Sequence, residues 1–248
     1  RAPQNEIDPI FDEFGFEYST AGRISDQSEL HRMNEICRIK GRAGVGLLSA
    51  LPVVDKRYGL PGLEDDVDSG RWIEADMQTP QGYVITVVCV YVHAGNTDDP
   101  EKMKQKYRFL DTMLIRMEQL RDEAAHGGKQ AVLCGDFNIA HTPLDIKNAK
   151  ANETHAGFLP EERAYVDKWL GELEFVDVMR NLAGDIQGPY TWWSQRGRAF
   201  DNNVGWRIDY QFATPELAET ACGFVIDKAP TYDLRWSDHA PLSIMYDI

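Results

Sequence analysis

The chain has 248 residues, of which 43% are hydrophobic, and this is enough apolar material for one large core in a single α/β domain. Its 40 acidic residues outnumber its 26 basic residues, and the net charge of −14 by itself argues against a nucleic-acid partner, because phosphate binding favours basic proteins. A locally basic cleft or bound divalent cations would change that balance. No apolar run reaches the roughly 18 residues that a membrane-spanning helix needs, so no membrane partner is expected.

Strand-like and helical segments alternate along the chain. The first three strands have no helix between them, which predicts antiparallel neighbours, and the third is so rich in β-branched residues that it resembles a central strand covered on both faces. In chain order the predicted strands are 45–51, 71–77, 83–92, 131–134, 205–213 and 241–246, and the predicted helices are 98–125 and 159–173. This order predicts packed sheets with helices outside rather than a purely parallel doubly wound sheet.

The longer predicted helix has clear boundaries. Apolar residues such as Leu110, Leu114 and Met117 recur at intervals of three and four. Pro100, preceded by two aspartates, is typical of a first helical turn, and the glycines at 127–128 end the pattern.

Four cysteines occur in the chain, and none forms a C-x-x-C pair. They are Cys37, Cys89, Cys134 and Cys222. This spacing predicts reduced, buried thiols and a cytoplasmic protein.

The segment 133–140 (LCGDFNIA) contains the most informative polar pair. Asp136 and Asn138 follow an apolar strand two positions apart, and in an extended backbone such positions face the same side. A carboxylate there can ligate a hard cation or orient a water, and a carboxamide can contact a phosphoryl oxygen. A simple Asp/Asn turn after a strand is the alternative interpretation.

Two further segments contain acidic and imidazole side chains. Asp238 and His239 are adjacent before an apolar strand, so their side chains diverge and each needs its own partner. Asp209 lies in an apolar strand context, where an unpaired carboxylate would cost several kcal/mol. His239 is the expected partner of Asp209, because an imidazole oriented by a carboxylate is a common acid/base or phosphate-binding arrangement. The alternatives are a structural histidine and an ion pair between Asp209 and Arg207.

Aromatic residues and arginines lie close together between 190 and 207. The sequence YTWWS at 190–194 is followed by Arg196, Arg198 and Arg207, a combination that fits stacking on sugars and bases beside phosphates. Ordinary core aromatics are the alternative. Tyr91, near the end of the strand 83–92, could donate to a phosphate or be a plain strand aromatic.

Other kinds of site fit poorly. The sequence has no G-x-S-x-G, Walker A, G-x-G-x-x-G or H-E-x-x-H motif. With no covalent nucleophile evident, the combination of Asp, Asn and His favours a metal-activated water that attacks phosphorus.

Together these segments resemble exonuclease III-type apurinic/apyrimidinic endonucleases of the endonuclease/exonuclease/phosphatase superfamily. The resemblance runs from about Phe16 to the end of the chain. It rests on GDFN at 135–138, FLPEER at 158–163, YTWWS at 190–194, NNVGWRIDY at 202–210 and SDHAP at 237–241. The first and last motifs occur across the wider superfamily, whereas TWW and NVGWRID favour the DNA repair branch.

The resemblance implies a fold and a set of catalytic roles. The fold is an α/β, four-layered sandwich with two packed mixed β-sheets flanked by helices, here without the first strands. Asp136 would activate the attacking water or steady the leaving oxygen, while Asn138 would hold Asp136 and contact the phosphate. His239, oriented by Asp209, would contact the scissile phosphate, and Tyr91 would donate to it.

A metal site is implied as well. Mg²⁺ or Mn²⁺ would supply Lewis acidity, with Asp136, Asn138, Asp238 and His239 at the metal site. In the family a glutamate is the principal ligand, and it would lie upstream of Arg1. Residues 1–248 are therefore expected to be one catalytic domain, truncated at its N-terminus. Ala94 is a second departure, because relatives usually place an amide side chain there.

The substrate implied is double-stranded DNA with abasic sites or 3′-blocked ends. Trp192, Trp206 and Ile208 would form an apolar pocket for a baseless sugar, with Arg207 also in contact with the substrate. An abasic nucleotide costs little to extrude because it has no stacking or pairing to lose. The expected reaction is hydrolysis 5′ to the abasic site, with 3′-to-5′ exonuclease and 3′-phosphatase side activities.

The resemblance also implies a monomer that works at the nucleoid in a bacterial cytoplasm. Two alternatives remain at this stage. One is a phosphoesterase acting on lipid or inositol phosphates, and the other is a DNA-binding relative without catalysis.

Overall fold

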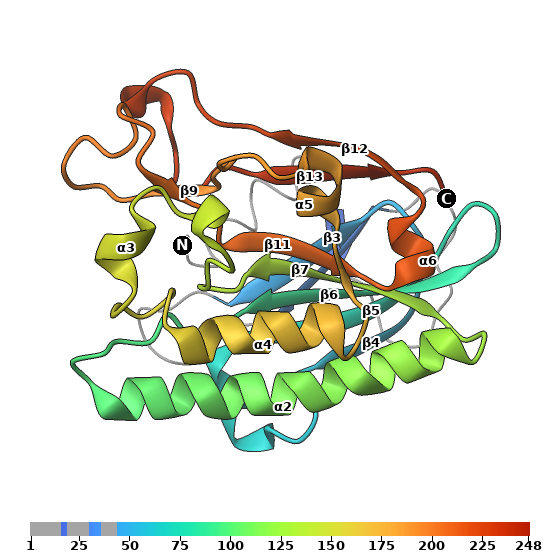
Figure 1. Ribbon diagram of the computed structural model, residues 1–248. Helices are drawn as coiled ribbons and strands as arrows, with labels where there is room; N and C mark the ends of the chain where they lie inside the picture. The colour runs from blue at the N-terminus through green and yellow to red at the C-terminus, as the bar shows by residue number, and fades with distance from the viewer. Residues whose placement is uncertain (1–15, 19–29, 36–43) are drawn as a thin grey trace.

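The computed structural model describes residues 16–18, 30–35 and 44–248 (Figure 1). The expectations for Arg1 and Cys37 lie outside these residues. Cys89 and Cys134 are half-buried, as expected for apolar strands, whereas Cys222 is exposed, so the prediction of buried thiols is wrong for Cys222.

A six-stranded mixed sheet lies at the centre of the molecule (Figure 1). Its strand order is β4-β5-β6-β7-β11-β8, in which β6 and β7 are parallel and all other neighbours are antiparallel. The strands are β4 (Val53–Tyr58), β5 (Trp72–Gln78), β6 (Val84–Tyr91), β7 (Gln130–Asp136), β8 (Val176–Asp177) and β11 (Asp209–Ala213). The strand predicted at 83–92 is therefore central, and its antiparallel pairing with the strand before it is confirmed.

Smaller sheets complete the β-structure of the described residues. They are formed by β1 (Phe16–Tyr18), β2 (Leu30–Glu35) and β3 (Val45–Ser49), by β9 (Trp192–Trp193) with β10 (Gly205–Trp206), and by β12 (Ala221–Ile226) with β13 (Leu242–Tyr246). The first strand predicted from the sequence, β3, therefore pairs with β2 rather than with β5.

Two long helices cover one face of the six-stranded sheet (Figure 1). They are α2 (Pro100–Ala125) and α4 (Pro160–Gly171), close to the predicted spans. Asp99 caps α2, because its side chain accepts a hydrogen bond from the Lys102 amide at 3.4 Å. The shorter helices are η1 (Glu64–Ser69), η2 (Pro143–Asp145), α3 (Ala149–Asn152), α5 (Val178–Ala183), α6 (Pro215–Ala218) and η3 (Tyr232–Leu234). None of the helices in the described part of the chain is long and apolar enough to cross a membrane.

The core lies on both faces of the central sheet. Val88, Leu133 and Phe212 pack against α2 and α4 on one face. On the other face, Ile73 and its neighbours pack against β3, while a further apolar cluster joins Val132 to α5, α6 and β13. The predicted fold class, packed sheets flanked by helices, is confirmed. The layer opposite the central sheet is divided among small sheets in the described residues.

The segment 205–213 is two strands rather than the one predicted. At the break, the Arg207 amide donates to the Asp145 carbonyl at 2.7 Å, and the Ile208 amide donates to the Thr191 hydroxyl at 3.2 Å. These bonds lead the backbone out of β10 and into β11. Side-chain alternation cannot show such a break, because the acceptors come from distant segments.

The polar positions of β5 are buried, although alternation predicts a half-exposed strand. Glu74 has no exposed surface, and Asp76 is 3% exposed. Arg57 contacts both carboxylates, while Arg116 holds Glu74 and Lys129 holds Asp76. Ion pairs therefore compensate the buried carboxylates of Glu74 and Asp76, so this face of β5 can be buried although it is not apolar.

Candidate active site

Three neighbouring strands bring polar side chains together at one edge of the central sheet. In register, Tyr91 of β6 lies opposite Asp136 of β7, and Asp136 lies opposite Asp209 of β11. Residues directly opposite each other on paired strands project from the same face of a sheet. Tyr91, Asp136 and Asp209 therefore share one face, at the ends of β6 and β7 and the start of β11.

Asp136 and Asn138 are held together by hydrogen bonds. The Asn138 amide donates to Asp136 Oδ1 at 2.9 Å, and Asn138 Nδ2 donates to Asp136 Oδ2 at 3.0 Å and to the Val92 carbonyl at 2.9 Å. Asn138 has φ 50°, in the left-handed region. The predicted proximity is thus observed, but its expected cause, an extended backbone, is wrong. With the amide nitrogen fixed, the side-chain oxygen is the atom available to a ligand.

Gly135 allows β7 to pass close to β6 just before Asp136. Its φ is +146°, and a Cβ atom at this position would lie 1.9 Å from the Val90 carbonyl oxygen. Only glycine therefore fits at this approach.

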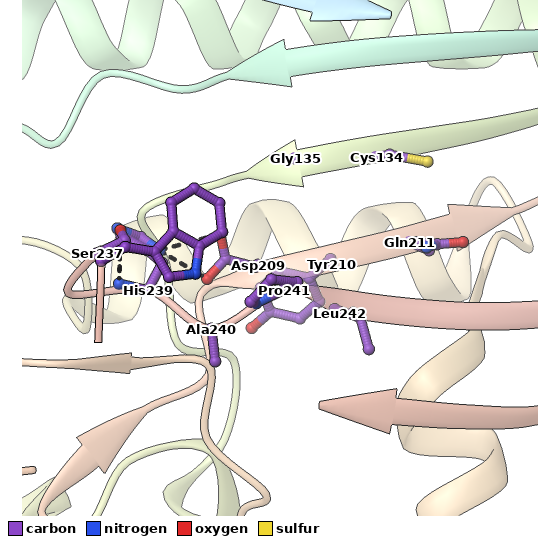
Figure 2. A pocket seen from close by; sticks show the side chains of 11 residues that line it. Cys134, Gly135, Asp209, Tyr210, Gln211, Ser237, His239, Ala240, Pro241 and Leu242 are labelled. Atoms are coloured by element: carbon purple, nitrogen blue, oxygen red, sulfur yellow. Dashed lines mark hydrogen bonds and ion pairs between the residues drawn. The ribbon is translucent and has the colours of Figure 1, made fainter. Parts of the chain in front are cut away.

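His239 faces two carboxylates from the central sheet. Its Nδ1 lies 2.9 Å from Asp209 Oδ2 and 3.1 Å from Oδ1, and its Nε2 lies 3.9 Å from Asp136 Oδ2. Figure 2 shows Asp209 and His239 side by side. Burial lowers the pKa of His239, but the hydrogen bond and charge of Asp209 outweigh burial and raise this pKa to about 9. The predicted pairing of Asp209 with His239 is confirmed by this geometry, and the Asp209 carboxylate favours the charged form of the imidazole.

The surroundings of Asp136 disfavour the charged form of its carboxyl group. Burial, followed by repulsion from Asp209, raises the pKa of Asp136 to about 7, against the opposing charges of His239 and Lys106. Such a carboxylate is well placed to accept a proton or to bind a cation.

Asp238 diverges from His239, as expected for adjacent residues. Asp238 Oδ2 accepts a hydrogen bond from Trp192 Nε1 at 3.1 Å, and the Asp238 carbonyl accepts one from the Trp193 amide at 3.0 Å. The charge of Asp238 also acts on His239. These bonds join the segment 237–241 to β9.

The three residues predicted to form the sugar pocket lie in one apolar cluster. Trp192 and Trp206 meet edge to face with centroids 6.0 Å apart, and Ile208 packs with them. Trp192 and Trp206 are half-buried, and Ile208 is almost completely buried.

Arg207 does not face this surface, so its predicted contact with substrate is wrong. The side chain has no exposed surface. Its Nε donates to Asp145 Oδ1 at 2.6 Å, and its Nη1 donates to Asp177 Oδ1 at 3.0 Å. The two carboxylates turn the guanidinium away from solvent and make it a buried ionic link between segments.

Tyr91 is fixed by Arg71 at its strand end. The Arg71 guanidinium carbon lies 4.6 Å from the centroid of the Tyr91 ring, and Arg71 Nη1 donates to the Tyr91 carbonyl at 3.0 Å. A cation over its face holds the ring in one orientation.

The donor set at this edge is suited to a hard divalent cation. The described residues contain no group of three or more His, Cys, Asp and Glu side chains that could hold a metal by themselves. Asp136 nevertheless supplies carboxylate oxygens, and Asn138 supplies an amide oxygen. Mg²⁺ commonly binds through one or two carboxylates and completes its shell with water and substrate phosphate, so these residues fit such an ion.

Sequence reasoning missed Lys106 and Glu162, which lie directly behind the site. Lys106 Nζ donates to the carbonyls of Asn138 at 2.9 Å and Ala94 at 3.2 Å, and forms an ion pair with Glu162. In the sequence, Lys106 cannot be distinguished from the solvent-exposed lysines of the same charged helix. The available signal was FLPEER at 158–163, which contains Glu162.

A cavity of about 280 Å³ adjoins the site (Figure 2). It is lined by Cys134, Gly135, Asp209, Tyr210, Gln211, Trp236, Ser237, His239, Ala240, Pro241 and Leu242. Asp209 and His239 therefore lie at the boundary between the catalytic edge and an open hollow.

Known proteins resemble this chain over most of its length. Residues 10–239 match the model of the Endonuclease/Exonuclease/phosphatase family. An exodeoxyribonuclease from Bacillus subtilis is 32% identical over 209 residues, which are 84% of this chain and 76% of that protein.

Solved structures show the same similarity. An AP endonuclease from Archaeoglobus fulgidus superposes with a TM-score of 0.73 at 28% identity, covering 89% of this chain and 88% of that one. A 3′ phosphatase from Neisseria bound to a product DNA hairpin superposes with a TM-score of 0.78 at 25% identity, covering 100% of this chain and 86% of that one.

Proposed function

The chain belongs to the endonuclease/exonuclease/phosphatase family, and we propose that within it this protein is a DNA repair nuclease of the exonuclease III type. Its reaction is hydrolysis of the phosphodiester 5′ to an abasic site, with 3′-to-5′ exonuclease and 3′-phosphatase side activities. The observation that carries the proposal is the convergence of Asp136, Asn138, Asp209 and His239 from three distant segments.

Each of these residues has a distinct part in the proposed reaction. His239 donates from Nε2 to a non-bridging oxygen of the phosphate, while Asp209 retains the proton at Nδ1 and fixes the ring. Asp136 orients the attacking water and takes its proton. Asn138 keeps Asp136 in place, and Tyr91 donates to the phosphate. The bond from phosphorus to the upstream 3′ oxygen breaks, and this oxygen takes a proton from solvent water, which leaves a 3′-hydroxyl and a 5′-phosphate.

A divalent cation, Mg²⁺ or Mn²⁺, fits beside Asp136 and Asn138 and would supply Lewis acidity to the phosphoryl group. His239, whose ring nitrogens face Asp209 and the phosphate, is proposed to act beside the ion rather than as a ligand, and Asp238 contributes its charge to His239. Trp192, Trp206 and Ile208 would accept the baseless sugar. The protein is proposed to act as a monomer on double-stranded DNA in a bacterial cytoplasm.

The test uses the full-length protein and a duplex with one abasic site and a labelled strand. With Mg²⁺ the protein should cut once, 5′ to the abasic site, and EDTA should abolish the cut. Phosphoinositides should not be hydrolysed. An Asp136→Ala variant that cuts as fast as the parent protein would contradict the assignment, and binding without any cleavage would favour a non-catalytic DNA-binding relative.

A further inference from the structure

Trp236 is an exposed aromatic side chain beside the catalytic edge. Its side chain is 86% exposed, the largest fraction of any large apolar residue that the structure describes. Two other exposed residues, Leu234 at 66% and Tyr232 at 40%, belong to η3, shortly before it in the chain. An indole so accessible contributes little to the core and is free to contact a ligand.

The position of Trp236 connects it to the site. It lines the cavity of about 280 Å³ together with Asp209 and His239. Ser237 follows it directly and accepts a hydrogen bond from the His239 amide at 3.1 Å. When a phosphate contacts His239, the base of the same nucleotide or of the adjacent nucleotide can therefore reach Trp236.

The backbone on both sides of Trp236 is anchored. Arg235 lies 4.0 Å from the Tyr232 ring centroid, and its Nη1 approaches the Trp193 carbonyl at 3.4 Å. On the other side, the Ala240 amide donates to the Thr191 carbonyl at 2.7 Å. Neighbours held in this way limit the conformational freedom that the backbone at Trp236 can lose when a ligand binds.

We propose that Trp236 is a base-stacking residue that binds the nucleobase adjoining the scissile phosphate. The inference rests on the proposed function, since it takes DNA as the substrate. Base stacking is tolerant of sequence, so Trp236 contributes affinity without selecting a particular base.

The experiment measures binding in EDTA, so that no bond is cut. Two labelled duplexes are compared: one has a single abasic site between normal nucleotides, and the other has abasic nucleotides on both sides as well. Trp236→Ala should weaken binding of the first duplex about tenfold, as expected for one lost stacked base, and should leave binding of the second unchanged. Trp236→Phe should restore most of the affinity.

Tyr83→Ala is the matched control, because Tyr83 is 69% exposed in the turn between β5 and β6 and should not affect either duplex. Equal binding of the first duplex by Trp236→Ala and the parent protein overturns the proposal. An equal loss of affinity for both duplexes, which would indicate a contact with the DNA backbone, also overturns the proposal. A parent protein that binds neither duplex overturns it as well. If the binding results are as expected but the parent protein cuts no DNA with Mg²⁺, the nuclease assignment is contradicted and the stacking proposal is not.

Discussion

Lys106 Nζ lies 2.5 Å from Glu162 Oε1, and neither side chain has any exposed surface. The pair links α2 to α4 behind the catalytic edge. Lys106 also binds the Asn138 carbonyl, while Glu162 Oε2 accepts from the amides of Gly157 at 2.6 Å and Leu159 at 3.0 Å. The buried charge pair therefore stabilises the left-handed turn at Asn138 through the hydrogen bond from Lys106 to the Asn138 carbonyl.

Replacing Lys106 with Met should destabilise the protein by about 3–5 kcal/mol, because it leaves the Glu162 carboxylate buried without its partner. Urea unfolding of the variant measures the loss. The double variant Lys106→Met with Glu162→Gln should recover part of it. Lys104→Met is the control, since Lys104 is 76% exposed and should change stability by less than about 0.5 kcal/mol. A Lys106→Met protein as stable as the parent would contradict a structural role for the pair.

Gly135→Ala should disrupt the catalytic edge more than its small change in size suggests. The added methyl group would meet the Val90 carbonyl oxygen at 1.9 Å, so β6 and β7 must separate just before Asp136. We expect a loss of at least about 2 kcal/mol in unfolding free energy and of most phosphodiesterase activity. Gly197→Ala is the control, because Gly197 also has positive φ but no atom lies within 4 Å of its added Cβ. Normal activity in Gly135→Ala would show that the strands can separate at little cost.

Asp209→Asn should lower kcat by about 10²- to 10⁴-fold with little change in KM, because the asparagine keeps the shape but not the charge that holds the His239 imidazolium. The measurement is steady-state cleavage of an abasic duplex at neutral pH. Asp201→Asn, in an exposed i,i+3 ion pair with Arg198, should behave like the parent protein. A change confined to KM would contradict this role and would indicate that Asp209 binds substrate rather than orients His239.

Acid should weaken the protein partly through Asp145. Burial raises the pKa of this carboxyl, but the charges and hydrogen bonds of Arg207 and Arg180 outweigh burial and lower it from 3.8 to about 2. Because the pKa of Asp145 is lower in the folded than in the unfolded state, the carboxylate stabilises the fold at pH values above its unfolded-state pKa. This contribution is lost as the pH falls through the folded-state pKa. The full contribution is about 2 kcal/mol, of which about 1 kcal/mol should be gone at pH 3.

The check for Asp145 compares the parent protein with Asp145→Asn by urea unfolding at pH 6 and pH 3. The difference in stability between the two proteins should be smaller at pH 3 by about 1 kcal/mol. A difference that stays constant over this range would show that Asp145 has no shifted pKa. Asp185→Asn, an exposed carboxyl, serves as the matched substitution.

The sequence by itself was sufficient for the elements whose causes are local. The start of α2 follows from Asp99 and Pro100, and the central position of β6 follows from its β-branched run. The polar groups of the site were also recognisable, because Asp136 with Asn138 and Asp238 with His239 are close in sequence. The need of a buried carboxylate for a partner also indicated the pairing of Asp209 with His239, but the assignment of all these residues to one site needed the family resemblance.

Tertiary structure alone decided the rest. Arg207 was expected at the substrate surface, yet Asp145 and Asp177 bury it, and Lys106 proved to support Asn138 rather than to be one more solvated lysine. Helical and strand periodicity arise from contacts a few residues apart, so they can be read along the chain. The environment of a charged side chain depends on which distant carboxylates the packed elements bring to it, and therefore only the folded arrangement determines it.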